Sequence, residues 1–294
     1  SSLPTAFGEN IVVRILDPGS QVKNLTEMGM LPEMEQQLLE MVCKPYGVVV
    51  VTGPTGSGKS TSLYAVLNHV STIQTSVFTL EDPIEYRMKL VRQTQVQEEV
   101  GLTFSRGLRA LLRQDPDVIL VGETRDQETA QLMVRAALTG HLVFTTLHTN
   151  DAVGAIPRLI DMGVEPFLLP ASLIGVVGQR LVRRICHHCK MPMENPQRTL
   201  EHFRVEMPNE LPLQLWQGTG CDDCENTGYK GRVGIYELLN VDDRFHEPIL
   251  KRASSQEYAK LAAEAGMKTM FEDGLTKATL GQTTLEELMS VTKI

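Results

Sequence analysis

The residues with the clearest chemistry lie at positions 53–60, where the chain reads Gly-Pro-Thr-Gly-Ser-Gly-Lys-Ser. This is a complete G-x-x-x-x-G-K-[ST] pattern, and it directly follows an apolar run at 46–52 that is rich in valine. A strand that leads through such a loop into a helix aims unpaired N–H groups and the positive end of the helix dipole at phosphate. We therefore predict that the chain binds a nucleoside triphosphate.

Each residue type in this loop has a distinct task. Glycines keep side chains away so that backbone amides surround the phosphates, Lys59 places a charge at the β and γ groups, and Ser60 offers a hydroxyl to Mg²⁺. The alternative is an ordinary glycine-rich turn, which would need the Lys-Ser pair and the preceding strand to coincide by chance. The predicted nucleotide-binding residues of the loop are Gly53, Pro54, Thr55, Gly56, Ser57, Gly58, Lys59, Ser60 and Thr61.

Four cysteines form a second chemical group. They lie in two C-x-x-C pairs, with 31 residues between the pairs: Cys186, Cys189, Cys221 and Cys224. Such pairs place four thiolates around one tetrahedral Zn²⁺, and in an intracellular chain this outweighs a disulfide. Free reduced cysteines and a redox-active pair are the alternatives. His187 and His188 lie within the first pair and could compete as ligands, but four cysteines suffice, so we expect both to be knuckle residues.

Further polar residues follow three apolar runs. The runs at 77–81, 118–122 and 142–146 alternate with helical segments, which is typical of a doubly wound parallel sheet. Ligands bind beyond the carboxyl ends of such strands, and phosphoryl transfer needs a group that activates water and a carboxylate for Mg²⁺. A helix cap or a solvated ion pair is the alternative for any one carboxylate. The residues expected to converge on the loop are Glu81, Asp82, Glu85, Glu123 and His148.

The remaining chain is less specific. We expect a strand at 9–16, a linker at 17–31 and a helix from Pro32 to about Cys43. The basic segment 176–185 is expected to be a helix end, where cations complement the dipole, with nucleic-acid binding as the alternative. Helices are expected from Arg244 onwards.

Composition limits the function classes. With 294 residues, 42% of them hydrophobic, the chain can bury one large core and smaller domains. It contains no run of about 18 apolar residues and no signal-peptide pattern, so we expect an intracellular protein. A net charge of −8 and 5% aromatic content argue against nucleic acid as a partner.

Four segments together resemble the motifs of the secretion ATPases, the enzymes that drive type II secretion and type IV pilus assembly. In order they resemble the phosphate loop, the acidic box, the second phosphate-site motif and the histidine box, at 53–61, 79–86, 109–126 and 138–149. The tetracysteine segment resembles the secretion and pilus-extension members rather than the retraction members. Residues 1–16 resemble the end of the family's N-terminal domain, so we expect the chain to be truncated at its N-terminus.

The resemblance implies roles for individual residues. Glu81 would polarise the attacking water, and Glu123 would hold the Mg²⁺ shell through water. Gly122-Glu123 replaces the family's usual Asp, so either glutamate could be the base. His148 and His141 would contact the γ-phosphate region, and Arg14 would reach the nucleotide from the N-terminal domain.

The resulting hypothesis is an α/β, RecA-like ATPase core with a parallel sheet and a zinc-bearing, mainly helical C-terminal region. The expected divisions are an N-terminal domain remnant, a linker with the first helix, the ATPase core, a tetracysteine zinc module and a helical region, at 1–25, 26–45, 46–180, 181–240 and 241–294. The family implies ATP, Mg²⁺ and Zn²⁺ as cofactors and a cytoplasmic homo-hexamer attached to an inner-membrane platform protein. A nucleic-acid translocase or recombinase with a zinc-ribbon module is the alternative function, and a nucleotide-regulated scaffold is a third.

Overall fold

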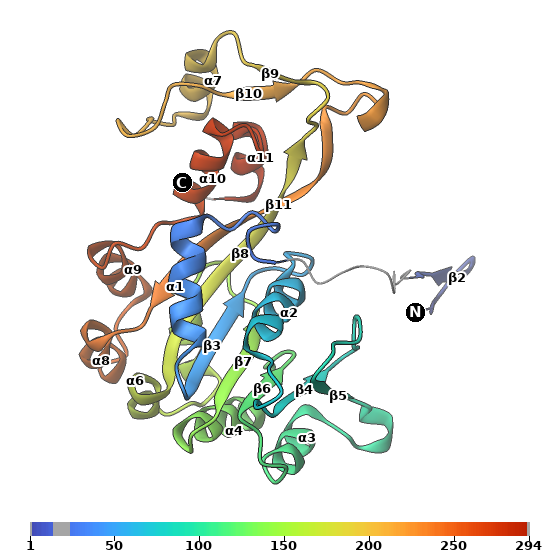
Figure 1. The fold of residues 1–294 in the computed structure, drawn as a ribbon, viewed down its shortest axis with the longest axis vertical. Helices are drawn as coiled ribbons and strands as arrows, with labels where there is room; N and C mark the ends of the chain where they lie inside the picture. Colours follow the sequence, from blue (N-terminus) through green and yellow to red (C-terminus); the bar gives the residue numbers. More distant parts are fainter. Residues whose placement is uncertain (1, 14–23, 293–294) are drawn as a thin grey trace.

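A computed structural model of the protein describes residues 2–13 and 24–292. Seven strands form one sheet in the order β11-β8-β3-β7-β6-β4-β5 (Figure 1). All neighbours are parallel except β11, which runs antiparallel to β8. The predicted parallel sheet is therefore a mixed, mostly parallel one. Its strands are β3 (Gly47–Thr52), β4 (Val77–Glu81), β5 (Val91–Gln95), β6 (Val118–Val121), β7 (Leu142–Leu147), β8 (Leu173–Ile185) and β11 (Tyr229–Asn240).

The four apolar runs of the sequence form β3, β7, β6 and β4, which confirms them as strands and places them side by side in the sheet. Such strands are covered on both faces, so their sequences are continuously apolar rather than alternating. Val48 and Val50 belong to one hydrophobic core, whereas Val49 and Val51 belong to the core on the opposite face.

Helices cover both faces of the sheet (Figure 1). One face packs against α1 (Pro32–Val42) and α2 (Lys59–Val70). The other packs against α3 (Phe104–Leu111), α4 (Gln127–Leu138), α5 (Ala155–Asp161), α6 (Leu169–Ser172), α8 (Asp243–Leu250) and α9 (Ser255–Glu264). None of the helices within the described ranges has the length and apolar character needed to cross a membrane.

The segment 176–185 is a strand, so its prediction as a helix end is wrong. It belongs to β8, which pairs with β3 from Leu173 to Gly178 and with β11 over most of its length. The β3 ladder holds the segment as far as Gly178, and the β11 ladder continues through its basic residues, so backbone pairing outweighs the helix-dipole argument. The far halves of β8 and β11 continue beyond the sheet as a two-stranded ribbon (Figure 1).

This ribbon carries the C-terminal region. A third hydrophobic core lies here, and it joins Val182, Val233 and Ile235 to the last two helices, which confirms a helical C-terminal region. The elements of this region are β9 (Lys190–Pro192), α7 (Pro196–Phe203), β10 (Trp216–Gly218), a 3₁₀ turn at Asp222–Cys224, α10 (Met270–Thr279) and α11 (Leu285–Val291). Two further 3₁₀ turns, at Glu98–Val100 and Pro166–Leu168, lie earlier in the chain.

The N-terminal residues form a hairpin of β1 (Ser2–Thr5) and β2 (Gly8–Ile11). The expected strand at 9–16 therefore ends at Ile11, and its residues from 14 onwards lie outside the described part. Residues 24–31 of the expected linker pack into the core on the α1 and α2 face, where Leu25, Met28 and Met30 are buried.

A buried ion pair fastens α10 to β11. Lys277 and Asp273 are fully buried, and the Lys277 ammonium lies 2.5 Å from the Asp273 carboxylate. Lys277 also donates to the Gly234 carbonyl at 2.8 Å, and Asp273 accepts from the Tyr236 N–H at 2.8 Å. Each charge thus has a charged partner and a backbone partner, as buried charges require.

We predict that Lys277→Met lowers the free energy of unfolding by about 3–5 kcal/mol, because it leaves the Asp273 carboxylate buried without its countercharge. Urea unfolding followed by circular dichroism measures the change. Lys251→Met, which breaks an exposed pair with Glu247, is the matched control and should have no measurable effect. Equal stability of Lys277→Met and the parent protein would contradict the prediction.

Candidate nucleotide-binding site and cysteine cluster

The phosphate-binding loop, residues 53–58, connects the buried strand β3 to α2. It passes close to β8, because a Cβ atom at Gly53 would collide with the Gln179 carbonyl oxygen and lie 2.7 Å from Ser57 Oγ. Gly53 and Gly58 also have positive φ angles of 150° and 86°. Gly53 therefore requires glycine for a steric and a conformational reason, and Gly58 for a conformational one.

Lys59 is the first residue of α2 and is 8% exposed. Its ammonium donates to the Gly53 carbonyl at 2.8 Å and to the Pro54 carbonyl at 3.0 Å. Burial lowers the pKa of Lys59, and the nearby Glu123 carboxylate opposes that shift. The N-cap residue Gly58 has no side chain that could cap the helix, so the first N–H groups of α2 are left without a side-chain partner, as they are in anion sites.

A cavity of 620 Å³ lies beside this loop. Loop residues 55–61 line one side of it, and the carboxyl ends of β4, β6 and β7 line another. The structure therefore brings together residues 55–61 and the polar residues that the sequence predicted beside them: Glu81, Asp82, Glu85, Glu123 and His148. Gly53 and Pro54 do not line the cavity, but their carbonyl oxygens accept hydrogen bonds from Lys59.

Glu81 is the last residue of β4 and is 4% exposed. One carboxylate oxygen accepts from Tyr64 on α2, and the other accepts from Thr79 at 2.5 Å and from Gln93 at 3.1 Å. Three donors thus hold this carboxylate in one orientation at the cavity wall. A carboxylate has about four lone-pair sites, so one remains for a further donor such as water.

Glu123 follows β6 and faces two basic side chains. Its Oε2 atom lies 2.7 Å from Arg125 Nε and 3.8 Å from His148 Nε2. Burial lowers the pKa of His148, and the charges of Lys59 and Arg125 lower it further, against the opposing effect of Glu123. The neutral imidazole is therefore the favoured form of His148 at neutral pH.

One sequence-predicted nucleotide residue, His141, lies elsewhere. His141 precedes β7, whereas His148 follows it, so a six-residue strand of about 20 Å separates them. At the amino end of β7, His141 Nδ1 lies 2.8 Å from the Ala136 carbonyl oxygen. The prediction that His141 contacts the γ-phosphate region of this cavity is wrong. Arg14 lies outside the described residues.

The cavity-lining residues that sequence reasoning did not assign to the site include two tyrosines and two arginines, namely Tyr64, Tyr86, Arg125 and Arg232. The rings of Tyr64 and Tyr86 pack edge to face, with centroids 4.4 Å apart. Burial, with a smaller contribution from Glu81, raises the pKa of Tyr86 to about 12. Tyr86 and Arg125 belong to motif segments, but Arg232 comes from β11, and no local pattern connects it to the loop.

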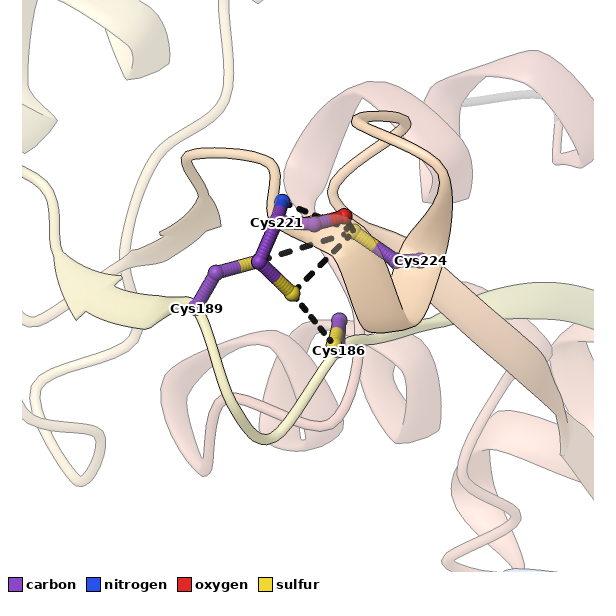
Figure 2. Close-up of side chains that lie close together, drawn as sticks. All are labelled: Cys186, Cys189, Cys221 and Cys224. Atoms are coloured by element: carbon purple, nitrogen blue, oxygen red, sulfur yellow. Dashed lines mark hydrogen bonds between the residues drawn. The ribbon is translucent and has the colours of Figure 1, made fainter.

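The four cysteines also come together, in the region between the ribbon and β9–β10. Figure 2 shows their side chains directed toward one another from two segments of the chain. Sulfur–sulfur distances are 3.8 Å for Cys186–Cys221, 3.8 Å for Cys189–Cys224 and 3.7 Å for Cys221–Cys224. Four sulfurs at 2.3 Å from a tetrahedral Zn²⁺ lie about 3.8 Å apart, so the cluster has the dimensions of a zinc site.

Backbone groups favour the thiolate form of Cys224, whereas burial raises the pKa of Cys189 and Cys221. Burial alone would raise the pKa of Cys224, but N–H groups of Cys221 and Gly228, each 3.3 Å from its sulfur, help to lower that pKa to about 6. Of the two histidines in the first knuckle, His188 lies 3.8 Å from Asp223. His187 has a ring nitrogen within 4.8 Å of both the Cys186 sulfur and an Asp223 oxygen.

Comparison with known proteins confirms the family resemblance. A family model described as type II/IV secretion system protein matches residues 1–290. The chain is 49% identical to the type IV pilus assembly ATPase PilB of Thermus thermophilus and 48% identical to the type II secretion system ATPase E of Vibrio cholerae. The alignments cover 99% and 100% of this chain, but only 33% and 58% of those relatives.

Solved structures show the same fold. The crystal structure of the pilus retraction motor PilT with bound ADP is 30% identical, with a TM-score of 0.70 over 96% of this chain and 69% of that one. The ATPase DotB of Legionella pneumophila, at 24% identity, has a TM-score of 0.66 over 92% of this chain and 65% of its own and shows likeness of fold alone.

We predict that Lys59→Met raises the pKa of His148, because it removes a positive charge that disfavours the imidazolium. A pH titration of the histidine ring signals by NMR measures the shift. Lys268→Met, which breaks an exposed pair with Glu33, is the control and should leave the His148 titration unchanged. A pKa of His148 that falls or stays constant in Lys59→Met would show that the two side chains do not interact.

Proposed function

The chain belongs to the type II/IV secretion system protein family, and we propose that it is the ATP-hydrolysing part of an assembly motor for pilin-like subunits. Because the chain spans 33% and 58% of its curated relatives, the activity and partners of the whole protein are part of this proposal. The observation that supports it most is the single cavity shared by the loop lysine, Lys59, and two strand-end carboxylates, Glu81 and Glu123. The RecA-like character of the core is part of the same proposal.

The site residues fit a triphosphate. In the proposed reaction, loop amides and Lys59 bind the β- and γ-phosphates, and Glu81 orients a water for in-line attack on the γ-phosphorus. The bond from the γ-phosphorus to the leaving ADP oxygen breaks as the water oxygen bonds, and a carboxylate accepts the water proton. Glu81 is the better candidate for this base, because three donors fix its orientation. Neutral His148 and Arg125 offer N–H donors near the transferred group.

The same cavity fits a divalent cation. The Ser60 hydroxyl and the Glu123 carboxylate both line it, and oxygen ligands of this kind suit Mg²⁺, whose water shell Glu123 would hold. When bound, Mg²⁺ neutralises charge on the β- and γ-oxygens. Glu123 is already paired with Arg125, so Mg²⁺ binding would compete with this ion pair.

We propose further that the complete protein works as a homo-hexamer on the cytoplasmic side of the inner membrane, against a platform protein of its machine. This part rests on the family. The identity to an assembly ATPase, 49%, exceeds the 30% to a retraction motor, which favours an extension-type or secretion-type machine. We infer no nucleic-acid partner, since the chain carries a net charge of −8.

The direct test compares three variants. Lys59→Ala should lose both Mg–ATP binding and hydrolysis, because it removes the loop's fixed cation. Glu81→Gln should bind Mg–ATP and lose at least about a hundredfold in turnover, as expected for loss of a general base. Glu123→Gln should also shift the Mg²⁺ concentration needed for half-maximal activity. Phosphate release and calorimetric binding measure these effects.

The controls separate the competing functions. Lys268→Ala, an exposed lysine, should hydrolyse ATP as the parent does. Stimulation of hydrolysis by single-stranded DNA would favour a translocase instead. Parent-level turnover in Lys59→Ala would refute the assignment, and an opposite result for the two glutamates would exchange their roles.

We also propose that the cysteine cluster binds one structural Zn²⁺ per chain. The four sulfurs would complete its shell, and the bound ion would tie the end of β8 to the start of β11 through Cys186, Cys189, Cys221 and Cys224. Its role would be in folding, because the cluster lines no part of the nucleotide cavity. Lys190 and Trp216, which flank it, donate to the Leu280 and Thr279 carbonyls at the end of α10.

Accordingly, Cys221→Ser should lose zinc and lower the melting temperature while retaining Mg–ATP affinity, because one lost thiolate weakens the metal site and metal binding contributes to folding. Elemental analysis counts zinc, and scanning calorimetry gives the melting temperature. Cys43→Ser, which changes a cysteine outside the cluster, is the control and should keep one zinc per chain. A parent protein that is free of zinc after purification in metal-containing buffer would contradict the proposal.

A further inference from the structure

Two buried polar atoms beside the phosphate-binding loop lack a partner. Ser57 Oγ and Gln179 Nε2 make no hydrogen bond to any residue in the ranges 2–13 and 24–292. Gln179 is fully buried on β8, and Ser57 is 4% exposed within the loop. Leaving a buried amide N–H unpaired is costly and rare in native proteins, so each such group calls for an explanation.

Gln179 touches the loop at both of its ends. Its backbone carbonyl oxygen lies against Gly53, and its Nε2 atom would lie 3.0 Å from a Cβ atom at Gly58. Its Oε1 atom accepts from Ser62 Oγ on the first turn of α2 at 2.7 Å. The amide group is therefore fixed at its oxygen, with its N–H groups directed at the end of the loop where α2 begins.

Gln179 does not line the cavity, so it would act on nucleotide only through the loop. The loop carbonyls of Gly53 and Pro54 are occupied by Lys59 in this structure. In the proposed function Lys59 bonds to phosphate, and those carbonyls then need another donor or must turn. Either change alters the loop where it packs against the Gln179 carbonyl oxygen at Gly53, while Gln179 Nε2 lies at the other end of the same short loop, beside Gly58.

We propose that Gln179 is a positioning residue for the nucleotide-loaded loop, whose Nε2 donates a hydrogen bond to the loop once Lys59 has turned to phosphate. This inference rests on the proposed function. It explains why the buried Gln179 Nε2 has no partner beside a loop whose carbonyls lose Lys59 as their donor when Lys59 binds phosphate. The loop-bound acceptor is a backbone carbonyl or Ser57 Oγ, both of which lie on the same segment.

A purely structural role for Gln179 gives a different expectation. If the only task of Gln179 were its hydrogen bond to Ser62, then removing the amide would lower the stability of the nucleotide-free protein. The affinity for Mg–ADP would fall only as far as this loss of stability requires. A positioning role predicts instead that the stability of the nucleotide-free protein does not fall. With Ser62 already changed to alanine, replacing Gln179 by methionine removes unpaired polar atoms and should keep or raise the nucleotide-free stability while it weakens nucleotide binding.

The experiment places Gln179→Met in the parent chain and in the Ser62→Ala variant. Calorimetry gives the dissociation constant of Mg–ADP, and the melting temperature is recorded without nucleotide. Gln179→Met should weaken Mg–ADP binding by about three- to tenfold in both backgrounds, the effect of one hydrogen bond. Its melting temperature in the Ser62→Ala background should not fall. Ser62→Ala alone should bind Mg–ADP within about twofold of the parent, since only the Oε1 contact is lost.

Several results would overturn the inference. Unchanged Mg–ADP affinity in Gln179→Met would show that Nε2 does not serve the loaded loop. If Gln179→Met and Ser62→Ala both lowered the melting temperature and weakened Mg–ADP binding to the same extent, Gln179 would have only a structural role. If the parent binds Mg–ADP and Lys59→Ala does not, a normal Gln179→Met refutes only this inference. A parent that does not bind Mg–ADP refutes the proposed function and the inference together.

Discussion

The pairing of β8 on both of its edges connects the two chemical centres of this protein. Along its first half β8 pairs with β3, which ends at the phosphate-binding loop, and along most of its length it pairs with β11. A shift of one residue in either ladder would turn every side chain to the opposite face. The register therefore sets Gln179 against the loop and sets Cys186 directly beyond the strand's end.

The buried carboxylate of Glu237 connects the C-terminal region to β11 and to the loop after β7. Glu237 on β11 is 4% exposed and accepts from the N–H groups of Ala152 at 2.5 Å and Met270 at 3.2 Å. Ala152 lies four residues after His148, and Met270 is the first residue of α10. Burial raises the pKa of Glu237, which the two N–H donors oppose. A single side chain thus joins the segment behind the nucleotide cavity to the C-terminal region, with hydrogen bonds that have strict geometric requirements.

Alternating charge organises the cavity itself. Glu123 lies between Arg125 and His148, and it also acts on Lys59. These groups share a partly buried space, where charges interact more strongly than in water. Binding of a polyphosphate would bring several negative charges beside Lys59 and Arg125 and would release Glu123 from part of its present pairing. This arrangement of charges is consistent with the proposed binding of a polyphosphate together with a cation.

Features that depend on neighbours along the chain can be predicted from the sequence alone. The loop 53–60, the strands around it and the two cysteine pairs each carry a local pattern, and their types and order agree with the structure. Local patterns could not decide what depends on partners distant in sequence. Segment 176–185 was predicted as a helix end because its basic residues suit one, yet two ladders make it β8. His141 and His148 belong to one motif but lie at opposite ends of β7, since a strand carries its two ends about 20 Å apart. Gln179, Tyr64 and Arg232 reach the loop or its cavity only through sheet order and helix packing, which arise from buried contacts across the whole fold and leave no spacing in the sequence.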